Sequence, residues 1–321
     1  MAKFDLAPIL ASVVKKFPRV ARMVRRVALA ANPEIVLVLD YPVTPKRRWT
    51  LGSPHPELYR ILEEGRDGYR ATLEGFLSFR DPMSTIPMFS PDGSSTSPWW
   101  GNGWIPPLDG AAIYGFIATR RPKIYMEVGS GNSTKFARKA IADLGLDTRI
   151  ISIDPQPRAE IDDLCDEVVR APVEDVDLSL FDQLGENDIL FVDNSHRAFM
   201  NSDVTAVFVD ILPRLKPGVI VQIHDILLPY DYPQDWLERW YSEQYLVAVM
   251  LLSKGTAFEV LLPNMFISED AELRKILDPV WEPRSMKDGD IFGYSFWLRA
   301  VQPSGAGECL PITPAQRPAV A

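Results

Sequence analysis

The sequence has few cysteines, no long apolar run and no excess of basic residues. Only Cys165 and Cys309 occur in 321 residues, which excludes a disulfide framework or a cysteine zinc cluster and fits a reducing compartment. No run approaches the roughly 18 apolar residues of a membrane-spanning helix, and no signal-peptide pattern opens the chain. The net charge of −9 argues against a general nucleic-acid binder. We therefore expect a soluble, cytoplasmic protein.

Apolar strands alternate with helices between residues 109 and 301, which predicts a parallel sheet covered on both faces. The last two strands are joined by a polar insertion rather than a long crossover, so we expect them to be antiparallel. The predicted fold is α/β, with a doubly wound, mostly parallel, Rossmann-like sheet of seven strands. The expected strands are 124–128, 149–153, 167–170, 188–193, 218–225, 257–262 and 295–300, and the expected helices of this region are 109–119, 133–144, 202–215 and 234–252.

The stretch 124–134 joins an apolar strand to a helix through a glycine turn, 129–131. Two glycines let the backbone approach a ligand, and the start of the helix offers free N–H groups. Asp154 ends the next strand, where a carboxylate can accept hydrogen bonds from both hydroxyls of a ribose. A dinucleotide fingerprint needs a third glycine where this chain has Thr134, and Glu127 suits a cationic ligand better than a pyrophosphate. The pattern predicts a nucleoside site, and the alternative is a tight turn without a ligand.

Two of the three histidines follow the ends of neighbouring strands. Asp193 and His196 come after the fourth strand, and His224 and Asp225 end the fifth. Oxygen and nitrogen ligands of this kind suit Mg²⁺, Mn²⁺, Ca²⁺ or Fe²⁺. The alternative is structural: Asp193 and His196 hydrogen-bond each other across a turn, and Asp225 caps a turn.

The segment 127–134, Glu-Val-Gly-Ser-Gly-Asn-Ser-Thr, resembles the first motif of class I S-adenosylmethionine-dependent methyltransferases, and Asp154 resembles their second. The resemblance covers about 109–300 and implies S-adenosylmethionine as the cofactor. Asp109 is expected near the pocket. The expected cofactor-binding residues are Glu127, Gly129, Ser130, Gly131, Asn132, Ser133, Asp154, Gln156 and Glu174.

The strand-end residues resemble the site of metal-dependent O-methyltransferases of the catechol and macrolide-sugar types. Carried over, Asp193, His224 and Asp225 become metal ligands, and His196 becomes the general base beside Asp193. The chain departs from the pattern at His224, where those families usually carry an acid. The implied metal is Mg²⁺ or Mn²⁺, with Fe²⁺ less favoured. A metal lowers the pKa of a bound hydroxyl, and an imidazole with an ordinary pKa of roughly 6.5 can then take its proton near neutral pH.

Residues 1–108 form the predicted N-terminal part, which is mainly helical and irregular. Residues 1–32 carry seven basic residues against one acid, with apolar residues at helical spacing and a break at Pro18. Such a helix can lie on an anionic membrane; the alternative is docking on its own domain or on a partner subunit of a homo-oligomer. The Trp-rich loop 81–107 is either a substrate wall or a plug onto the core. A second helix is expected at 55–77.

Together these features predict an S-adenosylmethionine-binding domain over 109–301 and a disordered tail, 302–321. The expected activity is O-methylation of a small-molecule hydroxyl on a sugar or natural product, without a nucleic-acid partner. Two alternatives stay open: a metal-dependent enzyme of another class on the same fold, and a non-catalytic protein that binds a membrane surface or a complex.

Overall fold

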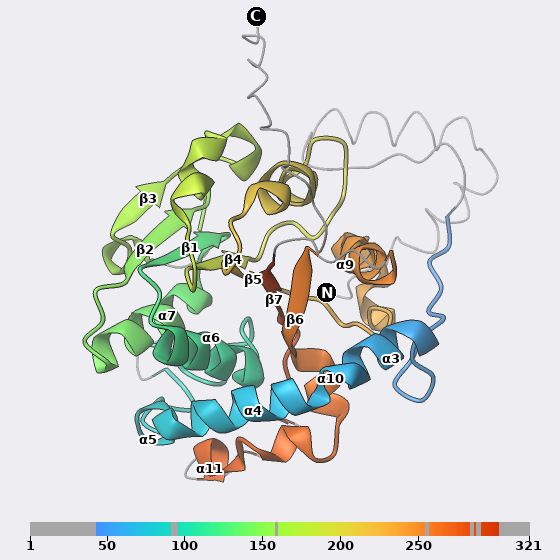
Figure 1. Ribbon diagram of the computed structural model, residues 1–321, viewed down its shortest axis with the longest axis horizontal. Helices are drawn as coiled ribbons and strands as arrows, with labels where there is room; N and C mark the ends of the chain where they lie inside the picture. Colours follow the sequence, from blue (N-terminus) through green and yellow to red (C-terminus); the bar gives the residue numbers. More distant parts are fainter. Residues whose placement is uncertain are drawn as a thin grey trace, which may run out of the picture. The chain divides into compact units, whose positions relative to one another are not determined.

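The structure is a computed structural model (Figure 1), and it describes residues 43–90, 96–157, 160–253, 257–282, 286 and 290–301. The predicted basic helix within 1–32, with its break, and the predicted tail 302–321 lie outside the described residues. The chain divides into two compact units, Met1–Lys46 and Arg47–Ala321. The predicted boundary between residues 108 and 109 falls inside the second unit.

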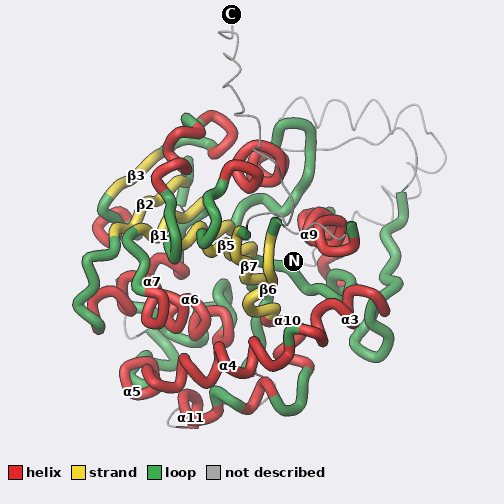
Figure 2. The backbone as a smooth tube through the Cα atoms, viewed as in Figure 1, coloured by secondary structure: helices red, strands yellow, loops and turns green. Residues whose placement is uncertain are grey.

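A seven-stranded sheet forms the centre of this unit (Figure 2). Its strands are β1 (Ile124–Val128), β2 (Arg149–Ile153), β3 (Glu167–Val169), β4 (Ile189–Val192), β5 (Ile220–Ile223), β6 (Phe258–Pro263) and β7 (Phe296–Ala300). Their spatial order is β3-β2-β1-β4-β5-β7-β6. The first five strands are parallel to one another, whereas β7 runs antiparallel to both β5 and β6. The predicted doubly wound fold and its antiparallel last pair are confirmed.

The strand order places a crevice where the chemistry is expected. Strands β1, β4 and β5 are buried along their whole length, which explains why their sequences are mostly apolar. Strand β2 lies on one side of β1, and β4 lies on its other side, so the order of the strands reverses at β1. At such a switch point the connections diverge, so the carboxyl ends of β1 and β4 border an open crevice.

Helices α6 (Pro107–Arg120) and α7 (Asn132–Asp143) lie side by side on one face of the sheet, and α4 (Arg66–Phe76) packs against α6 (Figure 1). Helix α6 is apolar on nearly all sides because it lies between the sheet and α4. The other α-helices within the described residues are α3 (Pro56–Glu64), α5 (Arg80–Met83), α8 (Asp203–Ala206), α9 (Glu243–Leu252), α10 (Asn264–Glu269) and α11 (Asp278–Trp281). None of the helices in the described ranges is long and apolar enough to span a membrane.

Three predicted helices are interrupted. The helix expected over 55–77 divides at Gly65 into α3 and α4, and the Tyr69 ring packs where a side chain at residue 65 would lie. The helix expected over 234–252 begins with a 3₁₀ segment, Gln234–Arg239, and is broken at Trp240, whose φ is 58°. A residue with positive φ cannot continue a right-handed helix.

The third interruption follows α8. A π-helical turn, Val207–Ile211, and a 3₁₀ turn, Leu212–Arg214, replace the second half of the helix expected over 202–215. Pro213 lies in this part and has no backbone N–H to donate, so a regular α-helical ladder cannot run through it.

The residues before α6 pack onto the same core as the sheet. Phe76 of α4 contacts Phe116 of α6 with ring centres 5.2 Å apart. Trp100 is buried between Phe136 and Trp281, at 5.3 and 4.9 Å. Trp100 of the Trp-rich loop therefore packs onto the core, as one of the two alternatives for this loop expected. Trp100 also lines a cavity at the carboxyl ends of the strands.

Candidate active site

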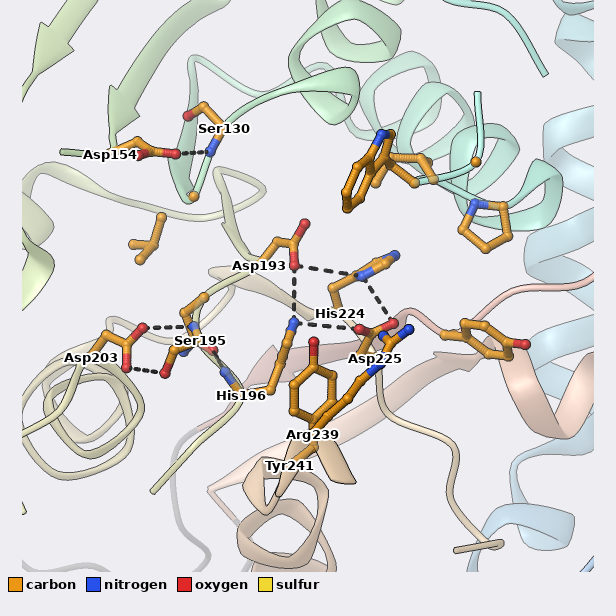
Figure 3. Close-up of a pocket in the computed structure, with 18 of the residues that line it drawn as sticks. Ser130, Asp154, Asp193, Ser195, His196, Asp203, His224, Asp225, Arg239 and Tyr241 are labelled. Atoms are coloured by element: carbon orange, nitrogen blue, oxygen red, sulfur yellow. Dashed lines mark hydrogen bonds and ion pairs between the residues drawn. The ribbon is translucent and has the colours of Figure 1, made fainter. Parts of the chain in front are cut away.

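A cavity of about 1170 Å³ lies beyond the carboxyl ends of β1, β2, β4 and β5 (Figure 3). Ser130 and Asp154 line one end, and His196 and His224 line the other. Single-ligand pockets span roughly 300–1,000 Å³, so this cavity has room for a nucleoside cofactor and a second small molecule.

The glycine turn requires its first glycine. Gly129 has a φ of 80°, and a Cβ there would lie 1.9 Å from the backbone oxygen of Asp193. No other residue fits such an approach, which joins the ends of β1 and β4. The backbone N–H of Gly131 donates to the Thr134 hydroxyl at 3.1 Å, and that hydroxyl donates to Glu127 at 2.5 Å. Thr134 thus closes the turn where a dinucleotide fingerprint would have glycine.

Glu127 supports the turn from beneath. Its carboxylate is fully buried, accepts a hydrogen bond from the Tyr125 hydroxyl at 2.9 Å and does not line the cavity. Burial raises the pKa of Glu127 to about 7, although hydrogen bonds from Thr134 and other hydroxyls oppose the rise. The predicted ligand-facing role of Glu127 is therefore replaced by a role in shaping the turn.

Asp154 is fixed at the end of β2. The backbone N–H groups of Ser130 and Gln156 donate to its two oxygens at 2.9 and 2.7 Å. Each carboxylate oxygen keeps a further lone pair for a hydroxyl donor. The predicted cofactor residues that line the cavity are Gly129, Ser130, Asp154, Gln156 and Glu174, whereas Gly131, Asn132 and Ser133 do not line it.

His196 lies among three carboxylates. Its Nδ1 is 2.9 Å from Glu243 Oε2, and its Nε2 is 3.2 Å from Asp193 Oδ1 and 3.5 Å from Asp225 Oδ2. Burial opposes the charge on the ring, but the hydrogen bonds to Asp193 and Glu243 outweigh it and raise the pKa of His196 well above its ordinary value. The expectation that this imidazole titrates near neutral pH is not supported, because its neighbours hold the proton on it.

His224 lies on the other side of the same carboxylates. Its Nδ1 is 3.4 Å from Asp225 Oδ1 and 3.7 Å from Asp193 Oδ1. Its Nε2 lies 3.3 Å from Asp109 Oδ2, but the ring N–H is not directed at that oxygen, so the contact is an ion pair and not a hydrogen bond. Burial opposes protonation, yet the charges of Asp193 and Asp225 raise the pKa of His224 to about 9.

Two residues of this cluster have a strained backbone. His196 and Asp225 have φ values of 59° and 55°. Non-glycine residues with positive φ are uncommon, and each costs on the order of 1 kcal/mol or more. The fold tolerates this strain at the two strand ends, where it turns both side chains toward the cavity in Figure 3.

The predicted metal site is not supported by the geometry. Asp193, His224 and Asp225 do converge, but each carboxylate also faces an imidazole at ion-pair distance. Across the described ranges, no group of three or more His, Cys, Asp or Glu side chains is arranged to hold a metal ion.

Sequence reasoning missed the residues that come from distant elements. Glu243, at the start of α9, is fully buried against His196, and nothing in its sequence context marks it. Arg197, Arg239 and Tyr241 also line the cavity. Asp109, which was expected near the pocket, lies in α6 and contacts His224.

Comparison with known proteins agrees with this fold. Residues 126–226 match the model of a methyltransferase domain family, and this segment runs from β1 past the end of β5. No curated protein matches the chain.

Similar solved structures are distant. Human N-acetylserotonin methyltransferase in complex with S-adenosylmethionine is 14% identical to this chain. The match covers 61% of this chain and 52% of the human chain, with a TM-score of 0.34. The plantazolicin methyltransferase BamL, in complex with a triazolic desmethylPZN analog and S-adenosylhomocysteine, is 13% identical. The match covers 77% of this chain and 90% of BamL, with a TM-score of 0.38. The strand order and the domain match carry the assignment: the fold is that of class I methyltransferases, and the match supports an S-adenosylmethionine-dependent enzyme.

Proposed function

We propose that this protein transfers a methyl group from S-adenosylmethionine to a hydroxyl of a small molecule. One observation carries the proposal: the nucleoside-type residues Ser130 and Asp154 share a single cavity with the polar cluster around His196 and His224. A methyl donor at one end and an acceptor at the other would both lie within this volume. Holding two reactants in one enclosed space supplies much of the catalytic advantage of an enzyme.

The cofactor end is suited to an adenosine. Asp154 is held by two backbone N–H groups and can accept from ribose hydroxyls, and the turn at Gly129 leaves backbone close to the ligand. When bound, S-adenosylmethionine supplies an electrophilic methyl group on a cationic sulfonium. The acidic lining at Asp154 and Glu174 suits a ligand with positive charge.

We infer that His196 removes the acceptor proton. Its Nδ1 is fixed by the buried Glu243, so Nε2 is aimed at the space between Asp193 and Asp225, which line the cavity. An acceptor hydroxyl entering there would meet a ring whose orientation is already fixed, which is the arrangement of a general base with its supporting carboxylate. Because its neighbours raise the pKa of His196, activity should increase toward alkaline pH.

The predicted divalent metal is not part of this proposal. Two of its expected ligands, Asp193 and Asp225, form ion pairs with the imidazoles of His196 and of the third, His224. The proton transfer to His196 needs only groups of the chain. Turnover that depends on added Mg²⁺ or Mn²⁺ and stops with a chelator would return the metal to the mechanism.

The first test is calorimetric titration of the full chain with S-adenosylhomocysteine. Asp154→Asn should weaken binding by about tenfold or more, because hydrogen bonds to a charged group contribute about 1.5–3 kcal/mol. Asp163→Asn, which removes an exposed acid nearby, is the matched control and should bind like the wild type. No binding to the wild-type protein would refute the proposal.

The second test separates catalysis from scaffolding. His196→Ala should keep S-adenosylhomocysteine binding. It should lose the formation of S-adenosylhomocysteine from S-adenosylmethionine when a panel of hydroxylated acceptors is supplied. Unchanged turnover in this variant would remove His196 from the mechanism. Binding without turnover in the wild-type protein would favour the non-catalytic alternative.

A further inference from the structure

Two arginines, Arg197 and Arg239, line the acceptor end of the cavity beside the aromatic residues Trp236 and Tyr241. The Arg239 guanidinium lies 4.3 Å from the ring centre of Trp236 and 5.7 Å from that of Tyr241. The Arg197 guanidinium lies 5.2 Å from the ring centre of Tyr241. Figure 3 shows Arg239 running alongside Tyr241 toward the cluster of histidines and carboxylates.

Among the described residues, these two arginines have no acidic partner. Within the part of the chain that the structure describes, neither Arg197 nor Arg239 forms an ion pair with a carboxylate, whereas Arg214 on the outer surface pairs with Asp182 at 2.7 Å. Arg197 donates to two backbone oxygens, one of them the carbonyl of Arg239 at 2.8 Å. That hydrogen bond joins the loop after β4 to the 3₁₀ segment before α9.

The carboxylates nearby are already engaged. Asp193 and Asp225 face the imidazoles of His196 and His224 at 3.2 to 3.7 Å. The charge of the two arginines at this end of the cavity is therefore not compensated by the cluster. The cofactor end, in contrast, presents acids such as Asp154.

Aromatic stacking prepares Arg239 for a ligand. A guanidinium on the face of an indole loses little entropy when it binds, and its N–H edges stay free to donate in the ring plane. Those edges match the paired oxygens of a carboxylate or phosphate.

We propose that Arg197 and Arg239 recognise an oxyanion, a carboxylate or a phosphate, on the acceptor. This inference rests on the proposed function, because it names the class of molecule whose hydroxyl would be methylated: an acidic hydroxylated compound such as a uronic acid or a sugar phosphate. The arginines bind and orient the acceptor, and they take no part in the proton transfer.

The test titrates inorganic phosphate into the full chain at constant ionic strength, with and without saturating S-adenosylhomocysteine, and follows heat or tryptophan fluorescence. Wild-type protein should show saturable binding, and Arg239→Gln should weaken it by about tenfold or more, as loss of a charged hydrogen bond predicts. Arg197→Gln should weaken it as well. The control is Arg80→Gln, which removes the same charge from an exposed position on α5 and should change nothing.

Displacement then identifies the source of the oxyanion. Glucuronate and glucose 6-phosphate should each compete with the bound phosphate, whereas glucose should not, and the tighter competitor indicates whether carboxylate or phosphate is preferred. Competition by glucose equal to that of the charged sugars would overturn the proposal.

Four further outcomes test the inference. Absence of phosphate binding to the wild type, or equal binding by Arg239→Gln, would overturn the inference. Loss of S-adenosylhomocysteine affinity in Arg239→Gln would overturn it too, because the arginines would then hold the cofactor carboxylate. If the wild type binds phosphate in an Arg239-dependent manner but never binds S-adenosylhomocysteine, the proposed function fails and the anion site stands.

Discussion

Replacing Glu243 by glutamine tests whether the buried pair with His196 is electrostatic. Glu243 is fully buried, and its Oε2 lies 2.9 Å from His196 Nδ1, with Asn194 donating to its other oxygen at 3.0 Å. Glutamine keeps the shape and removes only the charge. Hydrogen bonds to charged groups contribute about 1.5–3 kcal/mol, so Glu243→Gln should lower the free energy of unfolding by about that amount at pH 6.5.

The loss should depend on pH in a defined direction. The folded-state pKa of His196 is raised, so its pairing contributes stability that is complete below the ordinary value of 6.5 and is lost as pH rises through the folded pKa. Above that pKa the neutral ring can still hydrogen-bond to glutamine, so the penalty should shrink. The same change should move the alkaline rise in kcat/KM to lower pH, because one of the groups that hold the proton on His196 is gone.

Urea denaturation followed by circular dichroism, at several pH values from 6.5 to the alkaline limit of the folded protein, measures the penalty. Glu238→Gln removes an exposed acid five residues away and serves as the control. A penalty that stays equal at every pH would refute the electrostatic account and leave only packing. An unchanged pH profile of kcat/KM would show that Glu243 does not act through His196.

Three other changes test the site from different sides. Gly129→Ala should destabilise the fold strongly, by several kcal/mol, because the new Cβ would lie 1.9 Å from the backbone oxygen of Asp193 and the φ of residue 129 is positive. The control is Gly131→Ala, whose Cβ would meet no atom within 4 Å, and it should leave thermal unfolding nearly unchanged. Burial raises the pKa of Glu127 from its ordinary value of 4.5 to about 7, so the free energy of unfolding should fall as pH rises from 4.5 to 7. Urea denaturation should show a decrease on the order of 3 kcal/mol across that range in the wild type, and Glu127→Gln should abolish this decrease. Asp109→Asn, which weakens hydrogen bonds from backbone N–H groups near β7, should cost about 1.5–3 kcal/mol at neutral pH, and an unchanged urea midpoint would contradict it.

The sequence was sufficient for the sheet and for the position of the crevice. The five parallel strands are mostly apolar. The polar residues Asp154, Asp193 and Asp225 follow at the carboxyl ends of β2, β4 and β5. In such a sheet the strand ends must meet at one edge, so their neighbourhood follows from the topology alone. Breaks within helices were harder to predict. The interruption at Trp240 depends on its positive φ, and an aromatic residue in a sequence does not indicate such a backbone conformation.

Pairing within the site could not be predicted from the sequence. Glu243 lies 47 positions after His196 and belongs to a helix that the apolar pattern marks only as buried. Asp109 reaches His224 from a helix that precedes the whole sheet. Short-range spacing carries no information on contacts of this kind.

The two histidines illustrate the physical consequence. The positions of Asp193, Asp225 and His224 at strand ends in the sequence suggest ligands with available lone pairs, for which a divalent cation would be the expected partner. Once Glu243 and Asp109 are present, each imidazole has carboxylates on both of its nitrogens, and that environment favours the protonated ring. Asp193 and Asp225 already face imidazoles at ion-pair distance. Two buried acids from distant helices therefore change the chemistry of the same strand ends.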